Sequence, residues 1–201
     1  MDRALPANPL WNVPNLLTLM RVVMIPVMVL LAYWPVEAIR PQAQSAPNWQ
    51  NWSVAGLFMA AAITDWFDGY LARAWNQTSA FGRFLDPVAD KLMVAAALVI
   101  LVQWHPSVWL VIPAIVIISR EITISALREW MAEIGKRTNV AVSTIGKWKT
   151  TAQMTAITVL LLGHSPLEYL GFLLLYIAVI LTLWSMFIYL KAAWPDLKQS
   201  A

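Results

Sequence analysis

The chain has 201 residues and a formal net charge of +3, and with 60% hydrophobic and only 12% charged residues it is too apolar for a soluble domain of this length. The absence of cysteine excludes disulfides, a thiolate nucleophile and a cysteine-ligated zinc site. Basic residues gather near the ends of the apolar stretches, which favours anionic lipid or phosphate, and not nucleic acid, as their partner.

Six stretches along the chain are long enough to cross a lipid bilayer. A transmembrane helix needs about 20 mainly apolar residues, and short polar breaks with proline or glycine separate the stretches. The first stretch is too long for a signal peptide, so we expect it to be retained. We predict an all-α, polytopic membrane protein with six transmembrane helices in one bundle. We also expect residues 1–201 to form a single domain. The expected spans are residues 15–34, 52–74, 85–104, 107–130, 148–163 and 168–190.

The lysines and arginines outside these spans predict the orientation in the membrane. On one side of the predicted bundle the sequence has Arg40 alone. The residues on the opposite side are Arg3, Arg73, Arg83, Arg128, Lys136, Arg137, Lys147, Lys149, Lys191 and Lys198. Because basic loops face the cytosol, we place both chain termini and the loops after the second and fourth spans there.

Several acidic residues lie inside or at the edges of the apolar spans, where an unpaired charge costs roughly 3 kcal/mol or more. They are Asp65, Asp68, Asp86, Asp90 and Glu121. The first two are three residues apart and the next two are four apart, so each pair lies on one face of its helix. A short cytosolic loop joins the two helices, and we expect the four aspartates to meet in a polar cavity that faces the cytosol.

Neighbouring carboxylates of this kind repel one another unless protons or cations neutralise them. Oxygen ligands favour a hard ion, so the sequence predicts a site for two Mg²⁺ or Mn²⁺ ions, an arrangement used for in-line displacement at phosphorus. In the alternative, the acids only form ion pairs with Arg73, Arg83 and Lys91. Gly69 and Gly82 lie beside the acids, and they either let a pyrophosphate approach the backbone or serve helix packing.

The segment from Asp65 to Asp90 reads D-x2-D-G-x2-A-R-x8-G-x3-D-x3-D. This pattern resembles the signature of the CDP-alcohol phosphatidyltransferase family at every defined position. The segments Asn12–Arg21, Ser119–Trp130 and Ile145–Gln153 resemble the branch of that family that makes phosphatidylglycerophosphate, joining CDP-diacylglycerol to glycerol 3-phosphate and releasing CMP. The resemblance thus covers nearly the whole chain and implies a membrane enzyme of phospholipid biosynthesis.

The resemblance implies a role for each matching position. Asp65, Asp68 and Asp86 would bind the metal ions that hold the pyrophosphate of the donor. Asp90 would complete the metal site and act as the catalytic base on the acceptor hydroxyl. Because a carboxylate is a weak base, we expect Asp90 to bind metal loosely or to act mainly by orienting the hydroxyl. The residues that would bind the CDP part are Asn15, Gly69, Arg73 and Gly82.

Glycerol 3-phosphate carries a phosphate dianion, so its site needs fixed positive charge. The candidates for binding this phosphate are Arg120, Arg128, Lys147 and Lys149. An arginine inside a span is costly unless it has a partner, and an ion pair with Glu121 is the alternative for Arg120. For the other three residues the alternative is the ordinary cytosolic charge of a membrane protein. The resemblance favours phosphate binding for all four.

The resemblance also implies a homodimer in the inner, or cytoplasmic, membrane of a bacterium. Its partners would be CDP-diacylglycerol, glycerol 3-phosphate and the lipid bilayer.

One alternative function is that of a family member with another acceptor, such as inositol phosphate or phosphatidylglycerol. An intramembrane prenyltransferase is a further alternative, against which the grouping of the aspartates in one 26-residue segment argues. The last alternative is a cation or proton transporter, and the absence of an internal sequence repeat argues against it.

Overall fold

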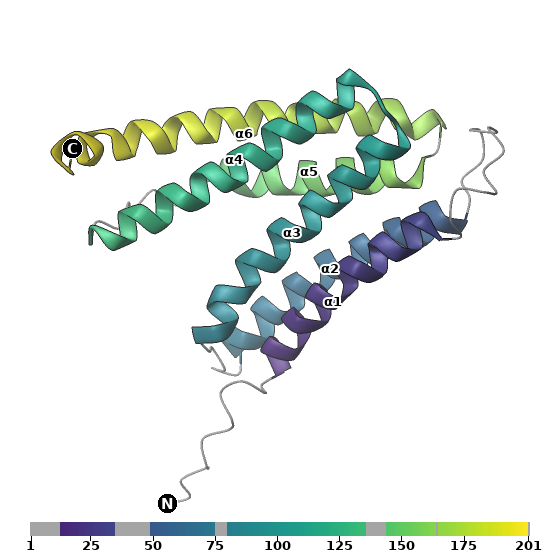
Figure 1. Cartoon of the computed structure of the whole chain (residues 1–201), viewed down its shortest axis with the longest axis horizontal. Coiled ribbons are helices and arrows are strands. Elements are labelled where there is room, and N and C mark those ends of the chain that lie inside the picture. The colour runs from purple at the N-terminus through teal and green to yellow at the C-terminus, as the bar shows by residue number, and fades with distance from the viewer. Residues whose placement is uncertain (1–12, 35–48, 75–79, 136–143, 164, 201) are drawn as a thin grey trace, which may run out of the picture. The chain divides into compact units, whose positions relative to one another are not determined.

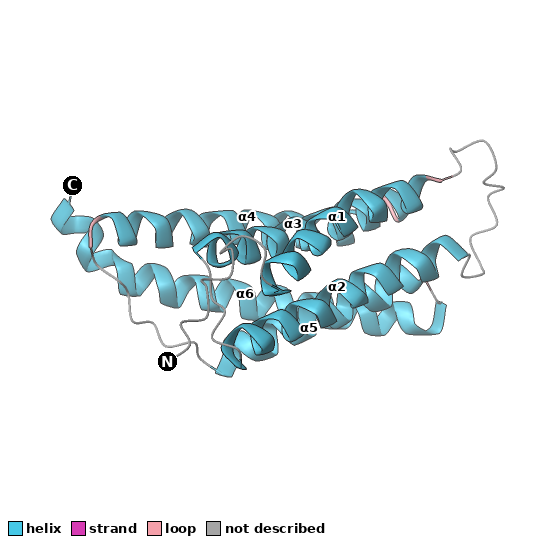
Figure 2. Cartoon of the chain, turned by 90° about the horizontal axis from the view of Figure 1, so that it is seen from below, coloured by secondary structure: helices cyan, strands magenta, loops and turns pink. Residues whose placement is uncertain are grey.

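The computed structural model of the chain describes residues 13–34, 49–74, 80–135, 144–163 and 165–200 (Figure 1). Every regular element within these ranges is a helix (Figure 2), which confirms the predicted all-α class. The six helices are α1 (Val13–Tyr33), α2 (Trp49–Ala74), α3 (Ala80–Trp104), α4 (Val108–Glu133), α5 (Thr144–Leu162) and α6 (Ser165–Ser200).

Two helices extend well beyond the predicted spans. Helix α3 begins at Ala80, before the predicted start at residue 85, so Gly82 belongs to the same helix as the aspartates that follow it. Helix α6 continues to Ser200, past the predicted end at residue 190. The predictions followed the apolar run and stopped where charge begins, but lysine and alanine are good helix formers and continue a helix after the apolar run has ended.

The described residues divide into two compact units. The first unit comprises Met1–Ile100 and Leu161–His164, and the second comprises Leu101–Leu160 and Ser165–Ala201. The first therefore contains α1, α2 and most of α3, and the second contains α4, most of α5, and α6. Helix α1 packs against α2 in the first unit, and α4 packs against α6 in the second (Figure 1).

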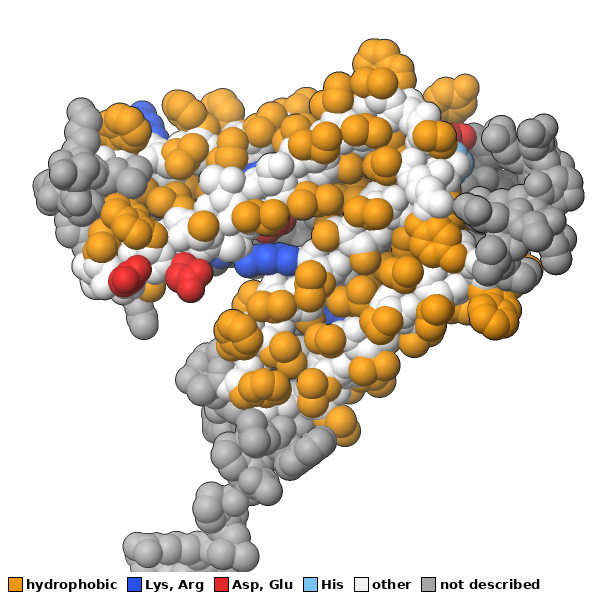
Figure 3. Space-filling model, in the orientation of Figure 1, with side chains coloured by type: hydrophobic (Ala, Val, Ile, Leu, Met, Phe, Trp, Pro, Cys, Tyr) orange, Lys and Arg blue, Asp and Glu red, His pale blue; other side chains and the backbone are white. Residues whose placement is uncertain are grey.

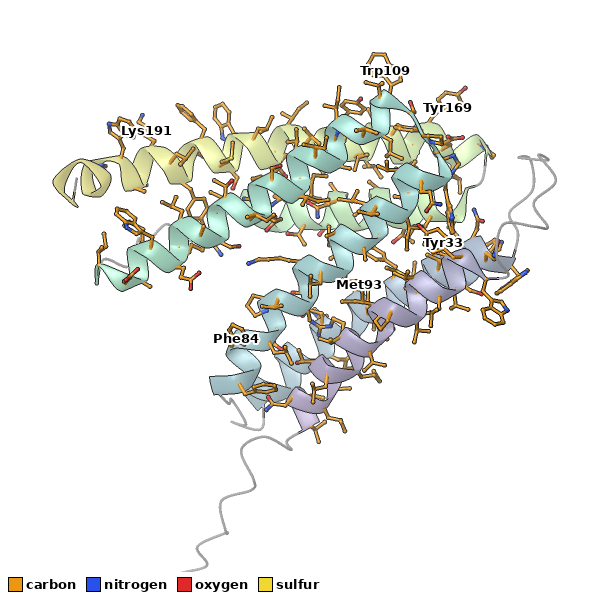
Figure 4. The ribbon with its side chains drawn as sticks, in the orientation of Figure 1. Tyr33, Phe84, Met93, Trp109, Tyr169 and Lys191 are labelled. Carbon is orange, nitrogen blue, oxygen red and sulfur yellow. The ribbon has the colours of Figure 1, made fainter. Side chains whose placement is uncertain are left out.

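The relative directions of the packed helices can be determined within each unit. At the start of α2, the side chain of Gln50 donates a hydrogen bond to the backbone carbonyl of Trp34, just beyond the end of α1, so the two helices are antiparallel. In the second unit, Trp109 and Tyr169 lie near the starts of α4 and α6 at the same end, while Lys191 lies toward the other end of α6 (Figure 4). Helices α4 and α6 therefore run in the same direction.

The described part of the chain exposes large apolar side chains and buries several charged ones. Polar residues such as Arg21 and Arg120 are buried, with 1% and 7% exposure, while Val23, Ile122 and Ile180 are at least 60% exposed. Hydrophobic side chains spread along the helices on the face shown in Figure 3. Buried charged residues beneath an apolar surface are the arrangement that a bilayer favours, because lipid cannot hydrate charged groups.

Three of the described helical segments are long and apolar enough to cross a membrane. They are Asn15–Tyr33, Val108–Glu133 and Pro166–Pro195. Of the other helices, α2 and α3 carry the aspartates of the signature segment, and α5 begins in a lysine-containing segment. These polar residues lower the mean hydropathy of α2, α3 and α5. The length and composition of the three apolar segments identify the chain as a membrane protein.

Helices α5 and α6 approach closely at Gly171, where an added Cβ would lie 2.8 Å from two side-chain atoms of Leu160. We therefore expect Gly171→Val to lower the melting temperature of the detergent-purified protein, because overpacking costs about 1–3 kcal/mol. The matched control is Gly56→Val on α2, where an added Cβ meets nothing within 4 Å. Thermal unfolding followed by tryptophan fluorescence measures both, and equal melting temperatures would contradict the close contact.

Candidate active site

Helix α1 turns a polar face into the interior of the first unit. Asn15, Thr18 and Arg21 are spaced by three residues and therefore lie on one face of the helix. All three are 1% exposed, while Leu16 and Val23 on the other side of the helix are more than half exposed. A buried guanidinium in a membrane protein needs acidic or carbonyl partners, and these come from the two following helices.

Arg21 binds two carboxylates that belong to different helices. Its Nη1 lies 2.8 Å from Oδ1 of Asp65 on α2 and 2.7 Å from Oδ1 of Asp90 on α3. Because a single nitrogen contacts both oxygens, the two carboxylates lie close together. The structure thus brings together two of the four aspartates predicted to form the metal site, and it does so through a residue of α1.

Asp86 joins the same arrangement through Thr18, whose hydroxyl donates a hydrogen bond to Oδ1 of Asp86. Thr18 and Arg21 are three residues apart on α1, and their partners Asp86 and Asp90 are four residues apart on α3. One face of α1 therefore meets one face of α3 in parallel register. This places three of the predicted aspartates around the polar face of α1.

The same register extends one turn further to two residues predicted to bind CDP. Asn15 precedes Thr18 by one turn on α1, and Gly82 precedes Asp86 by one turn on α3. Both are buried, so the polar face of α1 continues to the level of Gly82. Gly69 on α2 is half-buried. The predicted site residues whose side chains lie outside the described residues are Asp68, Arg73 and Lys147, and their roles stay predictions.

The oxygen atoms of this cluster fit a hard divalent cation by their chemistry. Asp65 and Asp90 already converge on one positively charged nitrogen, which shows that their position favours a cation. Within the described part of the chain, no three Asp, Glu or His side chains gather as ligands of a single ion. A complete coordination sphere therefore needs further donors, and the signature segment supplies Asp68 three residues after Asp65.

The second unit contains a buried cluster of opposite charge. Oε1 of Glu121 accepts hydrogen bonds from Nη1 of Arg120 at 2.6 Å and from Nζ of Lys149 at 2.8 Å. Both basic residues are buried, with 7% and 6% exposure. The structure thus brings together Arg120 and Lys149, two residues predicted to bind the acceptor phosphate. It also contains the ion pair between Arg120 and Glu121 that is the alternative prediction for Arg120. Because one acid faces two bases, an excess positive charge remains.

Helix α6 supplies neutral partners to the arginines of α4. Nη2 of Arg120 donates to Oγ of Ser185 at 3.0 Å, and Nη2 of Arg128 donates to the hydroxyl of Tyr189 at 2.9 Å. The guanidinium carbon of Arg128 also lies 5.1 Å from the centre of the Tyr189 ring, within the range of a cation–π contact. Sequence reasoning missed both hydroxyl residues and Thr18, because isolated Ser, Thr and Tyr residues in apolar helices carry no distinctive pattern.

Partly exposed carboxylates around a buried arginine in one unit and buried bases in the other, on an all-helical membrane fold, are the charged groups expected of an enzyme that handles phosphate groups in a lipid environment. The sequence model of the CDP-alcohol phosphatidyltransferase family matches residues 11–184. The chain therefore belongs to the CDP-alcohol phosphatidyltransferase family. Enzymes of this family generally depend on a divalent metal ion.

Curated relatives narrow the similarity within the family. The chain is 53% identical over 188 residues to the CDP-diacylglycerol–glycerol-3-phosphate 3-phosphatidyltransferase of Escherichia coli (strain K12). It shows the same identity to the enzyme of that name from Shigella boydii serotype 4. Each match covers 93% of this chain and 97% of the relative, so the similarity includes both units.

A double-mutant cycle tests the ion pair at the centre of the first unit. We expect Arg21→Met to lower the unfolding free energy by about 1.5–3 kcal/mol, because the two partly exposed carboxylates lose their hydrogen bonds to a charged partner. When Asp65→Asn is added, the loss is expected to be smaller than the sum of the single effects by about 0.5–3 kcal/mol. Denaturation in detergent provides the values, with Arg21→Lys as the charge-retaining control. Strictly additive losses would contradict the pairing.

Proposed function

We propose that this enzyme transfers the phosphatidyl group of CDP-diacylglycerol to glycerol 3-phosphate, giving phosphatidylglycerophosphate and CMP for phospholipid biosynthesis. The observation that carries the proposal is the convergence of Asp65 and Asp90 on one buried cationic nitrogen, in the segment with the family signature. Support for the acceptor comes from the 53% identical relatives, whose names specify glycerol 3-phosphate.

In this proposal the first unit binds the donor. Bound Mg²⁺ or Mn²⁺, as two ions, would neutralise the pyrophosphate and stabilise the departing CMP. The residues proposed to hold the ions are Asp65, Asp68, Asp86 and Asp90. The residues proposed to bind the CDP part are Asn15, Gly69, Arg73 and Gly82. The shared register of α1 and α3 supports this assignment, because it continues from the aspartates to the level of Asn15 and Gly82.

Asp90 is proposed to be the catalytic base. Arg21 binds its Oδ1 at 2.7 Å, and this contact holds the carboxylate in a defined orientation, while Oδ2 takes the proton of the acceptor hydroxyl. The acceptor oxygen forms a bond to the phosphorus that bears diacylglycerol. The bond from this phosphorus to the bridging oxygen breaks, and CMP leaves with the electron pair. Positioning of the hydroxyl is expected to contribute as much as proton removal, since a carboxylate is a weak base.

The second unit is proposed to bind the phosphate of the acceptor. The proposed ligands are Arg120, Arg128, Lys147 and Lys149. Arg120 and Lys149 support this role because they are buried and share one acid, which leaves positive charge uncompensated. The buried Nε of Arg120 also has no hydrogen-bond partner among the described residues. A buried donor of this kind gains energy by binding an anion.

The placement in the membrane completes the proposal. We infer that all six helices cross the cytoplasmic membrane of a bacterium as one domain, with both termini and a polar active-site cavity facing the cytosol. The shortest helix has 19 residues, roughly 28 Å, and the family match includes residues of both units. The distribution of lysine and arginine supports the orientation. Homodimer formation stays a prediction that rests on the family resemblance.

The acceptor is tested directly with the purified enzyme in detergent. CDP-diacylglycerol is supplied together with labelled glycerol 3-phosphate, inositol phosphate or serine, each in a separate reaction. We expect label to enter lipid, with release of CMP, only from glycerol 3-phosphate. Chelation with EDTA should stop the reaction, and Mg²⁺ or Mn²⁺ should restore it. Incorporation of inositol phosphate instead would identify another member of the family.

The role of Asp90 is tested by Asp90→Asn, which keeps the shape of the side chain and removes its basicity. We expect kcat to fall by about 10²- to 10⁴-fold, the usual contribution of a general base. The KM for CDP-diacylglycerol should change less than kcat, because Asp65, Asp68 and Asp86 would still hold the ions. Glu133→Gln, an exposed acid at the end of α4, is the matched control and should leave kcat unchanged. A kcat near wild type for Asp90→Asn would remove Asp90 from this role.

A further inference from the structure

Helix α6 contacts the two arginines of the proposed acceptor site through hydroxyl groups. Oγ of Ser185 lies 3.0 Å from Nη2 of Arg120, and the hydroxyl oxygen of Tyr189 lies 2.9 Å from Nη2 of Arg128. Both serine and tyrosine hydroxyls accept hydrogen bonds without carrying charge. The contacts therefore hold the guanidinium groups but leave their positive charge intact.

The spacing of the partners shows how these contacts act on the arginines. Ser185 and Tyr189 are four residues apart, about 6 Å along α6, while Arg120 and Arg128 are eight apart, about 12 Å along α4. The two helices pack together and run in the same direction. The hydroxyl-bearing residues are closer along their helix than the arginines are along theirs, and the long side chains of Arg128 and Tyr189 span the difference. Helix α6 therefore holds both guanidinium groups.

Free arginine side chains lose rotamer entropy when a ligand fixes them. A side chain that is already held loses less on binding, so the ligand binds more tightly. Arginine has five N–H donors, and one hydrogen bond to a hydroxyl leaves others for an anion. For Arg120, Glu121 binds Nη1 and Ser185 binds Nη2, while the buried Nε has no partner among the described residues.

We propose that Ser185 and Tyr189 are positioning residues that hold Arg120 and Arg128 in place for the phosphate group of the acceptor. The inference rests on the proposed function, because it takes glycerol 3-phosphate as the acceptor. The competing explanation is that the two contacts only stabilise the packing of α6 against α4. The two explanations differ in the kinetic constant that changes when a hydroxyl is removed.

The test uses Ser185→Ala and Tyr189→Phe in the full-length enzyme. Tyr189→Phe keeps the ring against Arg128 and removes only the hydroxyl. We expect each variant to raise the KM for glycerol 3-phosphate about tenfold, because the freed arginine then loses rotamer entropy when the phosphate fixes it. The KM for CDP-diacylglycerol and kcat should stay within about twofold. Ser185→Thr retains a hydroxyl and should restore the KM toward wild type.

Tyr176→Phe is the matched control. The hydroxyl of Tyr176 on α6 donates at 3.0 Å to the backbone carbonyl of Trp109 on α4, so this variant loses a hydrogen bond of similar length between the same two helices. A packing role predicts that Tyr176→Phe and Tyr189→Phe behave alike. A positioning role predicts that only Tyr189→Phe raises the KM for glycerol 3-phosphate. Calorimetric titration with glycerol 3-phosphate should show the same difference in Kd.

The outcomes separate this inference from the proposed function. If the wild-type enzyme uses glycerol 3-phosphate and the KM of Ser185→Ala and Tyr189→Phe is unchanged, the inference is wrong and the proposed function stands. The inference is also overturned if Ser185→Ala and Tyr189→Phe raise the KM for CDP-diacylglycerol as much as the KM for glycerol 3-phosphate. The same holds if Tyr176→Phe raises the KM for glycerol 3-phosphate as much as Tyr189→Phe does. If the wild-type enzyme releases no CMP with glycerol 3-phosphate, the proposed function fails, and the inference fails with it.

Discussion

The contact of Arg21 with Asp65 and Asp90 is the interaction on which the first unit depends. Each of these charges is costly inside a protein that lies in lipid, and the opposite charges beside it lower that cost. The three residues belong to α1, α2 and α3, so the same contact that neutralises the charges also ties the helices together. The aspartates proposed to take part in the chemistry therefore also help to hold the helices together.

The two units use the same principle with opposite sign. In the first, one base lies between two acids, and in the second, Glu121 lies between Arg120 and Lys149. Among the described ion pairs, acids therefore outnumber bases in the first cluster, and bases outnumber acids in the second. A negative cluster favours a divalent cation, and a positive cluster favours a phosphate dianion. The remaining charges thus match the two kinds of ion that a transfer between phosphate groups involves.

Sequence reasoning found the parts of this arrangement that stand out against an apolar background. Charged residues such as Asp86 and Arg120 are rare in membrane helices, so their presence and spacing identified the helix faces. Their partners could not be found in this way. Thr18, Ser185 and Tyr189 are neutral, and only the packing of helices distant in sequence gives them a partner. Helix ends were also missed, because the apolar run marks the lipid boundary while helices such as α6 continue beyond it.

The neutral partners have a physical advantage over acidic ones. An ion pair with Glu121 fixes Arg120 but also cancels part of the charge that an anionic ligand would meet. A hydroxyl fixes a guanidinium at a smaller electrostatic cost, because it carries no net charge. Arg128, held by a hydroxyl and by the face of an aromatic ring, keeps its full charge for a ligand. A site for an acceptor phosphate needs both fixed geometry and strong positive charge, and hydroxyl groups on a neighbouring helix satisfy the two requirements together.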